Sequence, residues 1–378
     1  MTRLLNVRLL RHLFLLLFVM AAALPALAQE IYSDLSSRPT GRIYFNSVTP
    51  KSKWELVHRK YDKKPTAIWG TLYLPENVQG RIAAMVISHG SAGVQPKDID
   101  RWVRTFNRMG MAAFVVDSFG PRGISNTMDD QSQLSPAAND ADALSALRLL
   151  STDPRIDPKK IGQIGFSRGG GVAMDMALHA FRKGVIDDDT RFAALIGFYP
   201  SCTQVWWEVP PPPLTGAPLM LALGEKDDYT PAQPCLNVAR IMQRDGQSVE
   251  VHVYPGAYHD FDNTRAYFKY FPGATTPREC PQAILDVQHD AYYHLLTGEK
   301  YDSTRVVFRG DRLDDLYRDF PGGWPGIYFR ETSKDNTLQY ANILNAYQGI
   351  VAEKPSVNTN PKVFLSECVV DNCYDAGI

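Results

Sequence analysis

The segment IGQIGFSRGGGVAMDMALHA, residues 161–180, determines how this chain is interpreted. Its first apolar run ends at Gly165-Phe166-Ser167-Arg168-Gly169, and apolar residues then return with helical spacing. The pattern glycine–x–serine–x–glycine between a strand and a helix is typical of a sharp turn that exposes a serine hydroxyl at the edge of a sheet. The alternative is a glycine-rich helix start, capped by the serine.

Strand-like and helix-like segments alternate on both sides of this turn. The alternation predicts an α/β fold with a mostly parallel central sheet and helices on both faces. Right-handed crossovers bring the carboxyl ends of parallel strands to one edge of such a sheet, where sites assemble. The expected strands are 67–74, 82–88, 112–116, 161–164, 192–199, 218–224 and 249–255, and the expected helices are 98–109, 137–150, 169–182, 234–244 and 281–296.

The first 28 residues have the pattern of a secretory signal peptide. Basic residues precede the apolar run LFLLLFVMAAALPALA, and Ala26-Leu27-Ala28 has the small–x–small pattern of a cleavage site. We therefore expect an exported protein, periplasmic or secreted, with no membrane attachment after cleavage. The alternative is an uncleaved membrane anchor, but the apolar run is short for a bilayer span and contains Pro25.

Export affects how the five cysteines are interpreted, because disulfides persist in oxidising compartments. We expect Cys202 to pair with Cys235, and Cys368 with Cys373, which leaves Cys280 free. The chain has no CxxC motif and so no sign of a redox pair or a zinc site.

The charge balance and the change of pattern near residue 298 bear on the possible partners and on the domain limits. Among 378 residues, 40 are Lys or Arg and 41 are Asp or Glu, so the balance predicts no binding to nucleic acid. Strand–helix alternation stops near residue 298. We therefore expect an α/β domain over 29–297 and a C-terminal extension of unknown role over 298–378.

Two further segments supply partners for a reactive serine, in the chain order serine, acid, histidine that the fold requires. GEKDDYTP, residues 224–231, follows an expected strand, and Asp227 is the favoured acid, with Asp228 as the alternate. Either aspartate could instead serve the turn or cap the next helix. His259 lies in the loop PGAYHDFD, where it could reach the serine hydroxyl as a general base.

Backbone N–H groups would stabilise the oxyanion of such a reaction. We expect one from Arg168, directly after the serine, and one from Ser91 in the loop His89-Gly90-Ser91-Ala92-Gly93, where His89 has a structural role. Arg122 in DSFGPRG is a candidate for binding a substrate carboxylate. An ion pair that holds the loop 117–136 explains Arg122 equally well.

Taken together and in order, HGSAG, VVDSFGPRG, GFSRGG, GEKDDYTP and YPGAYHDF resemble the dienelactone hydrolase family of the α/β-hydrolase superfamily, over about residues 60–297. The resemblance implies the α/β-hydrolase fold and places the family's nucleophile, acid and histidine on Ser167, Asp227 and His259. It places the oxyanion donors on Ser91 and Arg168. Dienelactone hydrolases proper use cysteine at this turn, so the serine points toward ordinary carboxylic esters or lactones.

The expected function is therefore that of an exported serine hydrolase that forms an acyl-enzyme with a small-molecule ester or lactone. No cofactor is expected, because the chain has neither HExxH nor a phosphate-binding glycine loop. Alternatives are a serine peptidase or acyltransferase of related fold and, from another class, a non-catalytic binding module. The loops 117–136 and 200–217, the latter with Trp206 and Trp207, are expected to shape the pocket.

Overall fold

The computed structural model describes residues 30–206 and 213–263, and short strands between residues 274 and 371. The predicted signal peptide lies outside the described residues, as do Trp207, Cys280, Cys368 and Cys373. Within the described part of the chain, no helix combines the length and the apolar character that a membrane span requires.

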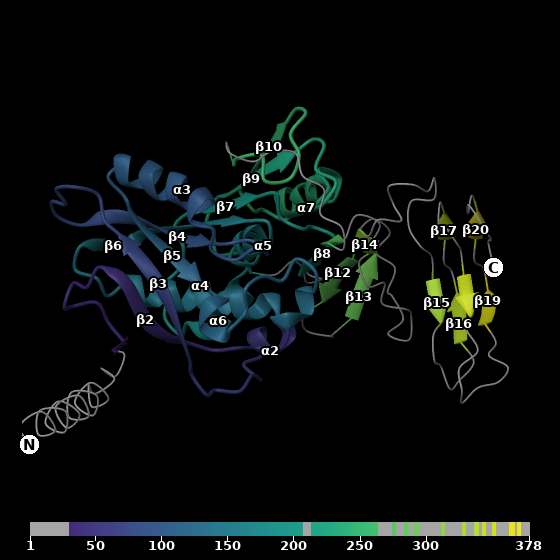
Figure 1. The fold of residues 1–378 in the computed structure, drawn as a ribbon, viewed down its shortest axis with the longest axis horizontal. Coiled ribbons are helices and arrows are strands. Elements are labelled where there is room, and N and C mark those ends of the chain that lie inside the picture. The colour runs from purple at the N-terminus through teal and green to yellow at the C-terminus, as the bar shows by residue number, and fades with distance from the viewer. Residues whose placement is uncertain are drawn as a thin grey trace, which may run out of the picture. The chain divides into compact units, whose positions relative to one another are not determined.

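The central sheet has nine strands, which lie side by side in the order β1-β2-β3-β5-β4-β6-β7-β9-β10 (Figure 1). β3 pairs antiparallel with both β2 and β5, whereas every pairing from β5 to β10 is parallel. This is the α/β-hydrolase fold that the sequence predicts. The strands are β1 Ile31–Tyr32, β2 Gly41–Ser47, β3 Thr66–Tyr73, β4 Ile82–Ser88, β5 Ala112–Asp117, β6 Ile156–Phe166, β7 Leu195–Phe198, β9 Leu219–Gly224 and β10 Val249–Tyr254.

Helices cover both faces of the sheet, and each face has its own apolar core (Figure 1). On one face, Ile99, Val103 and Phe106 of α3 pack on the sheet. The buried strands serve both cores, because alternate residues of a strand point to opposite faces: Val86 of β4 belongs to one core and Ile87 to the other. The helices are α2 Lys53–Val57, α3 Pro96–Arg108, α4 Pro136–Leu150, α5 Arg168–Asp175, α6 His179–Val185 and α7 Ala232–Arg244.

The expected helix over 169–182 is two helices, α5 and α6. Leu178 is extended between them and forms an isolated β-bridge with Leu214. The N–H of Thr215 donates to the carbonyl of Ala177, at 2.9 Å, and the N–H of His179 donates to that of Pro213, at 2.8 Å. These hydrogen bonds to a distant loop replace helical ones, so the local helical pattern is interrupted.

The expected helix over 281–296 is wrong. Residues Ala283–Asp286 form strand β12 and Ala291–His294 form strand β13, which pair antiparallel. β12 also pairs parallel with β8, Gln204–Trp206. Pairing with a segment almost eighty residues away supplies backbone hydrogen bonds that local helical periodicity does not reveal, and such long-range pairing overrides helix propensity.

Beyond residue 263, the described residues form short strands, with no helix among them; β11 lies before residue 298, and β14 to β20 lie in the C-terminal extension. β11 pairs antiparallel with β14, and three parallel pairs follow, β15 with β18, β16 with β19 and β17 with β20. Their bounds are β11 Ala274–Thr276, β14 Asp311–Leu313, β15 Ile327–Phe329, β16 Asn336–Gln339, β17 Asn342–Leu344, β18 Ile350–Ala352, β19 Val363–Ser366 and β20 Val369–Asp371.

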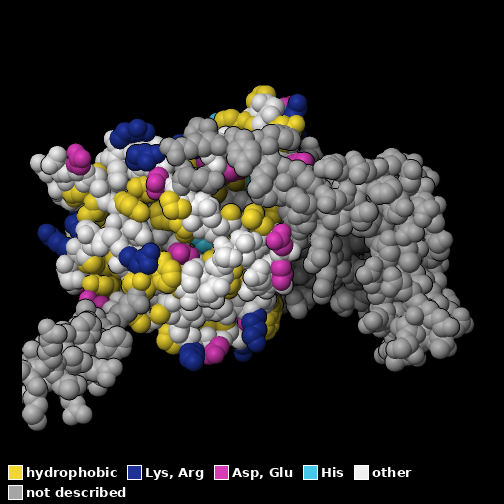
Figure 2. Space-filling view, viewed as in Figure 1, with side chains coloured by type: hydrophobic (Ala, Val, Ile, Leu, Met, Phe, Trp, Pro, Cys, Tyr) yellow, Lys and Arg dark blue, Asp and Glu magenta, His cyan; other side chains and the backbone are white. Residues whose placement is uncertain are grey.

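The predicted disulfide between Cys202 and Cys235 is present, with the two Cα atoms 4.9 Å apart. It joins the segment after β7 to the first turn of α7. On the face of the described residues seen in Figure 2, acidic and basic side chains are interspersed, as expected for a chain whose formal net charge is −1.

Candidate active site

Ser167 stands at the turn between β6 and α5 in a backbone conformation that L-residues rarely adopt. Its φ is 53° and its ψ is −114°. Such a conformation costs about 1–3 kcal/mol and persists only where the surrounding structure enforces it. The Ser167 N–H donates to the Phe198 carbonyl at the end of β7, at 2.9 Å, which holds the turn against the neighbouring strand.

The two glycines of the pentapeptide make this turn possible. A Cβ at Gly165 would lie 1.8 Å from the Gly169 carbonyl oxygen, and a Cβ at Gly169 would lie 2.2 Å from the Ser88 carbonyl oxygen. No side chain fits at either distance. The requirement for glycine at both positions therefore has a steric cause, and the serine marks the sharp strand-to-helix turn that the motif predicts.

Asp227, which follows β9, and His259, which follows β10, contact each other. Asp227 Oδ2 lies 2.8 Å from Nδ1 of the imidazole. Its Oδ1 accepts hydrogen bonds from the N–H groups of Tyr229, at 3.0 Å, and Thr230, at 2.8 Å. Asp227 therefore both stabilises the turn and orients the histidine, whereas Asp228, the alternate acid, is exposed.

Aromatic rings and a second carboxylate hold the histidine loop. The imidazole lies 4.6 Å from the Tyr199 ring, measured between centroids. The Tyr199 hydroxyl donates to Asp262 Oδ1, at 2.5 Å, and the Trp102 indole donates to Asp262 Oδ2, at 2.7 Å. Trp102 lies on α3, so these contacts fix the loop to that helix.

Ser167 and His259 follow parallel strands of one sheet, with β7 and β9 between β6 and β10. The strand ends are joined laterally, because the Tyr199 N–H donates to the Ala222 carbonyl at 2.8 Å, just as Ser167 bonds to Phe198. Among the described residues, no hydrogen bond joins the serine hydroxyl directly to the imidazole. Catalytic hydrogen bonds are often long before substrate binds.

The predicted oxyanion donors lie beside the serine. The loop 89–93 approaches so closely that a Cβ at Gly90 would lie 3.3 Å from Ser167 Cβ. In the described part of the chain, the backbone N–H groups of Ser91 and Arg168 donate to no acceptor. Arg168 begins α5, so its N–H is one of the donors that a helix start leaves free.

His89 has the structural surroundings predicted for it. The ring is buried, with Nδ1 2.7 Å from the Gly90 carbonyl oxygen, and the Ser118 N–H donates to Nε2 at 3.2 Å. Since Nε2 accepts, the proton lies on Nδ1. Burial lowers the pKa of His89, in keeping with a neutral ring that holds the loop 89–93.

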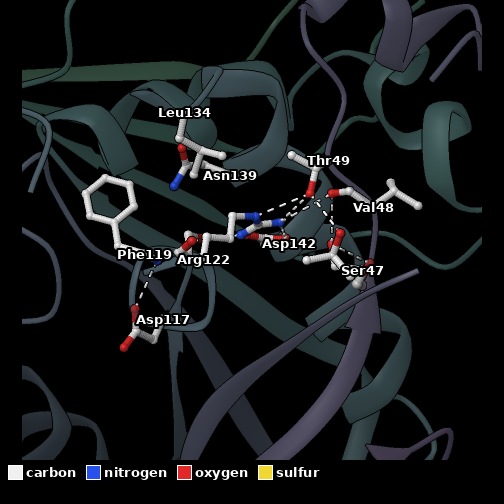
Figure 3. Close-up of polar contacts among 12 residues, drawn as sticks. Ser47, Val48, Thr49, Asp117, Phe119, Arg122, Leu134, Asn139 and Asp142 are labelled. Atoms are coloured by element: carbon white, nitrogen blue, oxygen red, sulfur yellow. Dashed lines mark hydrogen bonds and ion pairs between the residues drawn. The ribbon is translucent and has the colours of Figure 1, made fainter. Parts of the chain in front are cut away.

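The Arg122 side chain forms an ion pair with Asp142 (Figure 3). Its guanidinium donates to both carboxylate oxygens of Asp142, at 2.7 and 3.0 Å, and to the Ser118 carbonyl, at 2.7 Å. Thr49, just after β2, accepts from Nε at 3.3 Å. The Arg122 side chain is 8% exposed and that of Asp142 is fully buried. These are the contacts of the structural alternative, and we assign Arg122 no part in the reaction.

Gln131 is a site residue that sequence reasoning missed. It lies in the short helix η2, Gln131–Gln133, in the middle of the loop 117–136. Its side-chain amide contacts Ser91, Arg168 and Tyr229, which come from three different strand ends. A glutamine in a polar loop carries no sequence signal for such contacts. The expectation that this loop reaches the pocket was the nearest indication.

A buried acidic pair joins α4 and the end of α5. Asp140 of α4 and Asp175 at the end of α5 are both buried, and Lys53 forms an ion pair with Asp175. Among the described residues, no group donates a hydrogen bond to either carboxyl oxygen of Asp140. Burial, and then the charge of Asp175, raise the pKa of Asp140 well above its usual range.

One curated protein matches part of this chain. A protein of Aquifex aeolicus (strain VF5) named "Putative carboxymethylenebutenolidase" is 30% identical over 115 residues, which are 30% of this chain and 45% of that protein. The chain thus matches less than half the length of this relative.

Solved structures show more distant likenesses. The native esterase 2 of Thermogutta terrifontis is 20% identical, with a TM-score of 0.43, covering 58% of this chain and 86% of that one. A structure titled as a putative dienelactone hydrolase of Klebsiella pneumoniae is 17% identical, with a TM-score of 0.44, covering 61% and 92%. The model of the dienelactone hydrolase family matches residues 68–278, more than half of the chain. The chain therefore belongs to the dienelactone hydrolase family.

Proposed function

We propose that this protein is an exported serine hydrolase that cleaves carboxylic esters or lactones through an acyl-enzyme. The observation that carries the proposal is the strained Ser167 at the strand-to-helix turn, with an Asp227–His259 pair at the same edge of the sheet. A serine on a strained strand-to-helix turn, with an acid–histidine pair at the same sheet edge, is the nucleophile arrangement of this fold.

The orientation of the histidine defines the proton route. Because Nδ1 faces the Asp227 carboxylate, Nε2 is the nitrogen left to meet the serine hydroxyl. Nε2 takes the proton as Ser167 Oγ bonds to the substrate carbonyl carbon. It then gives that proton to the departing alkoxide oxygen as the ester bond breaks. Asp227 stabilises the imidazolium that exists between these steps.

The oxyanion is held by backbone donors. The free N–H groups of Ser91 and Arg168 would donate to the carbonyl oxygen as it gains charge, and the N-terminus of α5 adds a favourable field. Water then attacks the acyl group by the same route in reverse and releases the carboxylic acid. Each step uses only groups of this chain, the ester and water.

The location and domain limits belong to the same proposal. Residues 1–28 would be removed during export, 29–297 would form the hydrolase domain and 298–378 the extension. The Cys202–Cys235 disulfide supports an oxidising compartment. N-terminal sequencing of protein from the periplasm or medium tests export: a mature chain beginning at Gln29 is expected, and an intact chain in the membrane fraction would contradict it.

Hydrolysis of p-nitrophenyl butyrate, compared with a peptide p-nitroanilide, tests the reaction class. We expect turnover of the ester, with kcat reduced at least about 10³-fold in both Ser167→Ala and His259→Ala. Preferred cleavage of the anilide would make the protein a peptidase. An inactive wild-type protein, or an active Ser167→Ala variant, would refute the proposal.

A further inference from the structure

We propose that Gln131 is a positioning residue that holds the two oxyanion donors in register with the histidine side of the site. This inference rests on the proposed hydrolase function and adds a residue outside the catalytic triad. The geometry points to it because a single side chain joins three loops that follow different strands, β4, β6 and β9.

On the oxyanion side, Gln131 contacts both residues whose backbones supply the donors. Arg168 Nη1 donates to Gln131 Oε1 at 2.8 Å, and also contacts the Gln131 carbonyl at 3.4 Å. Gln131 Nε2 donates to Ser91 Oγ at 3.0 Å. The two donors thus share one tether, although they lie 77 positions apart in the chain.

On the histidine side, Gln131 Nε2 donates to the Tyr229 hydroxyl at 3.3 Å. The Tyr229 ring lies against His259, with 4.8 Å between centroids and 71° between ring planes. The Tyr229 N–H in turn donates to Asp227. Gln131 therefore connects the oxyanion donors with the ring that confines the proposed general base.

The chemistry of the partners fixes the orientation of the Gln131 amide. A guanidinium can only donate, so the amide oxygen must face Arg168 and the amide nitrogen must face the hydroxyls of Ser91 and Tyr229. A flipped amide would lose the bond to Arg168. Arg168 is itself buried, which lowers its pKa to about 10, and further bonds to Leu134 and Asn139 hold its guanidinium.

Loss of this tether should affect the transition state more than substrate binding, because the donors act on charge that develops during the reaction. Removing an entire oxyanion donor costs about 10²- to 10³-fold in kcat, and misplacing two donors should cost less. We expect Gln131→Met, which keeps the side-chain length, to lower kcat for p-nitrophenyl butyrate by about 10- to 100-fold with KM within about threefold.

Gln133→Met is the matched control. Gln133 lies in the same short helix but is exposed, and within the described part of the chain its amide donates only to the carbonyls of Asn126 and Asp130. Both variants remove one glutamine amide from η2. Gln133→Met should keep kcat within about twofold of the wild type, and an equal loss in the two variants would overturn the proposal.

An inhibitor that mimics the oxyanion distinguishes misplaced oxyanion donors from a general loss of structure. 1,1,1-Trifluoropentan-2-one, which adds to a reactive serine to form a charged hemiketal, should bind Gln131→Met more weakly by the same factor by which kcat/KM falls. Unchanged inhibition beside a lowered kcat/KM would contradict the role in the oxyanion site.

Ser91→Ala provides a second variant should Gln131→Met not fold. It keeps the backbone donor but removes the hydroxyl that Gln131 binds. We expect a 3- to 10-fold loss of kcat and, in the double variant, little loss beyond that of Gln131→Met alone. No loss in Ser91→Ala, or additive losses, would overturn the inference. An inactive wild type would instead refute the hydrolase function itself.

Discussion

Ser167 keeps a conformation that costs free energy because its neighbours leave it no other. Gly165 and Gly169 have no room for a Cβ, and the Ser167 N–H is bonded to β7. In this conformation Ser167 is the residue directly before α5, which begins at Arg168. The same contacts therefore enforce the strain and fix the position of the proposed nucleophile.

The two neighbouring aspartates give a matched pair of variants. Asp227→Asn removes the carboxylate beside His259 Nδ1, whereas Asp228→Asn changes an exposed side chain. We expect the first to lower kcat by about 10³- to 10⁴-fold, since the imidazolium loses its counter-charge and its orientation. The second should change kcat less than about twofold. Steady-state ester hydrolysis decides, and equal effects would show that Asp227 does not orient the base.

Asp140 predicts a pH dependence of stability. Its pKa is raised above the unfolded value of 3.8, so the folded state keeps a proton that the unfolded state releases. The contribution of Asp140 to stability therefore falls as pH rises above 3.8, by up to about 1.4 kcal/mol per pH unit, until the folded pKa is passed.

Asp140→Asn cannot titrate, so its stability relative to the wild type should increase with pH. Urea unfolding of both proteins at pH 5, 6, 7 and 8 measures the difference. A difference that stays constant over this range would show that Asp140 is ionised in the folded protein.

Site residues could be predicted from the sequence where their position depends on a local turn or loop. The turn around Ser167 and the loop position of His259 follow from the order of strands and turns. Gln131 could not be predicted, since its contacts with Ser91, Arg168 and Tyr229 arise only when three strand ends meet. Arg122 was ambiguous for the same reason, because its partner Asp142 lies on another element.

Helix α4 ties several elements together through buried charge. It contributes Asp142 to the ion pair with Arg122, which joins η1, Gly120–Arg122, to the segment after β2. Removing one member of a buried pair leaves an unpaired charge and costs about 3–5 kcal/mol. The pair thus fixes the start of the loop that also carries Gln131.

We expect Arg122→Met to lower the free energy of unfolding by about 3–5 kcal/mol. It should reduce kcat/KM by the same factor for p-nitrophenyl butyrate and for a hemisuccinate ester, because Arg122 contacts no substrate in this account. The double variant Arg122→Met/Asp142→Leu should recover stability, since no unpaired charge remains. A selective loss for the anionic ester would restore the carboxylate-binding role.

Elements with strong local patterns were predicted, and those decided by distant partners were not. β4 and β5 read as continuous apolar runs because both their faces are buried. The expected helix over 281–296 is instead β12 and β13, whose pairing with β8 depends on residues far along the chain. β2 was missed although it pairs with β3 throughout its length.

The Cys202–Cys235 disulfide is a covalent cross-link within the folded chain, and it bears on the proposed export. Cys202 and Cys235 close a loop with a sequence separation of 33 residues. A cross-link of that span stabilises a fold by about 3–4 kcal/mol, mainly by restricting the unfolded chain. The double variant Cys202→Ser/Cys235→Ser should lose that amount in urea unfolding, and no loss would contradict a structural role.

A count of free thiols tests the proposal that the protein matures in an oxidising compartment. If Cys368 pairs with Cys373 as predicted, the unreduced and denatured protein should react with one equivalent of Ellman's reagent, at Cys280. Three equivalents would show that the C-terminal pair is reduced. Five would show that the protein matures in a reducing compartment.

The central claim is that the hydroxyl of residue 167 is the group that attacks. Treatment with a fluorophosphonate, followed by peptide mass spectrometry, measures this directly. The account predicts a single adduct on the peptide containing GFSRGG, with labelling slowed at least about 100-fold in His259→Ala. An adduct on another residue, or labelling of residue 167 that does not depend on His259, would contradict it.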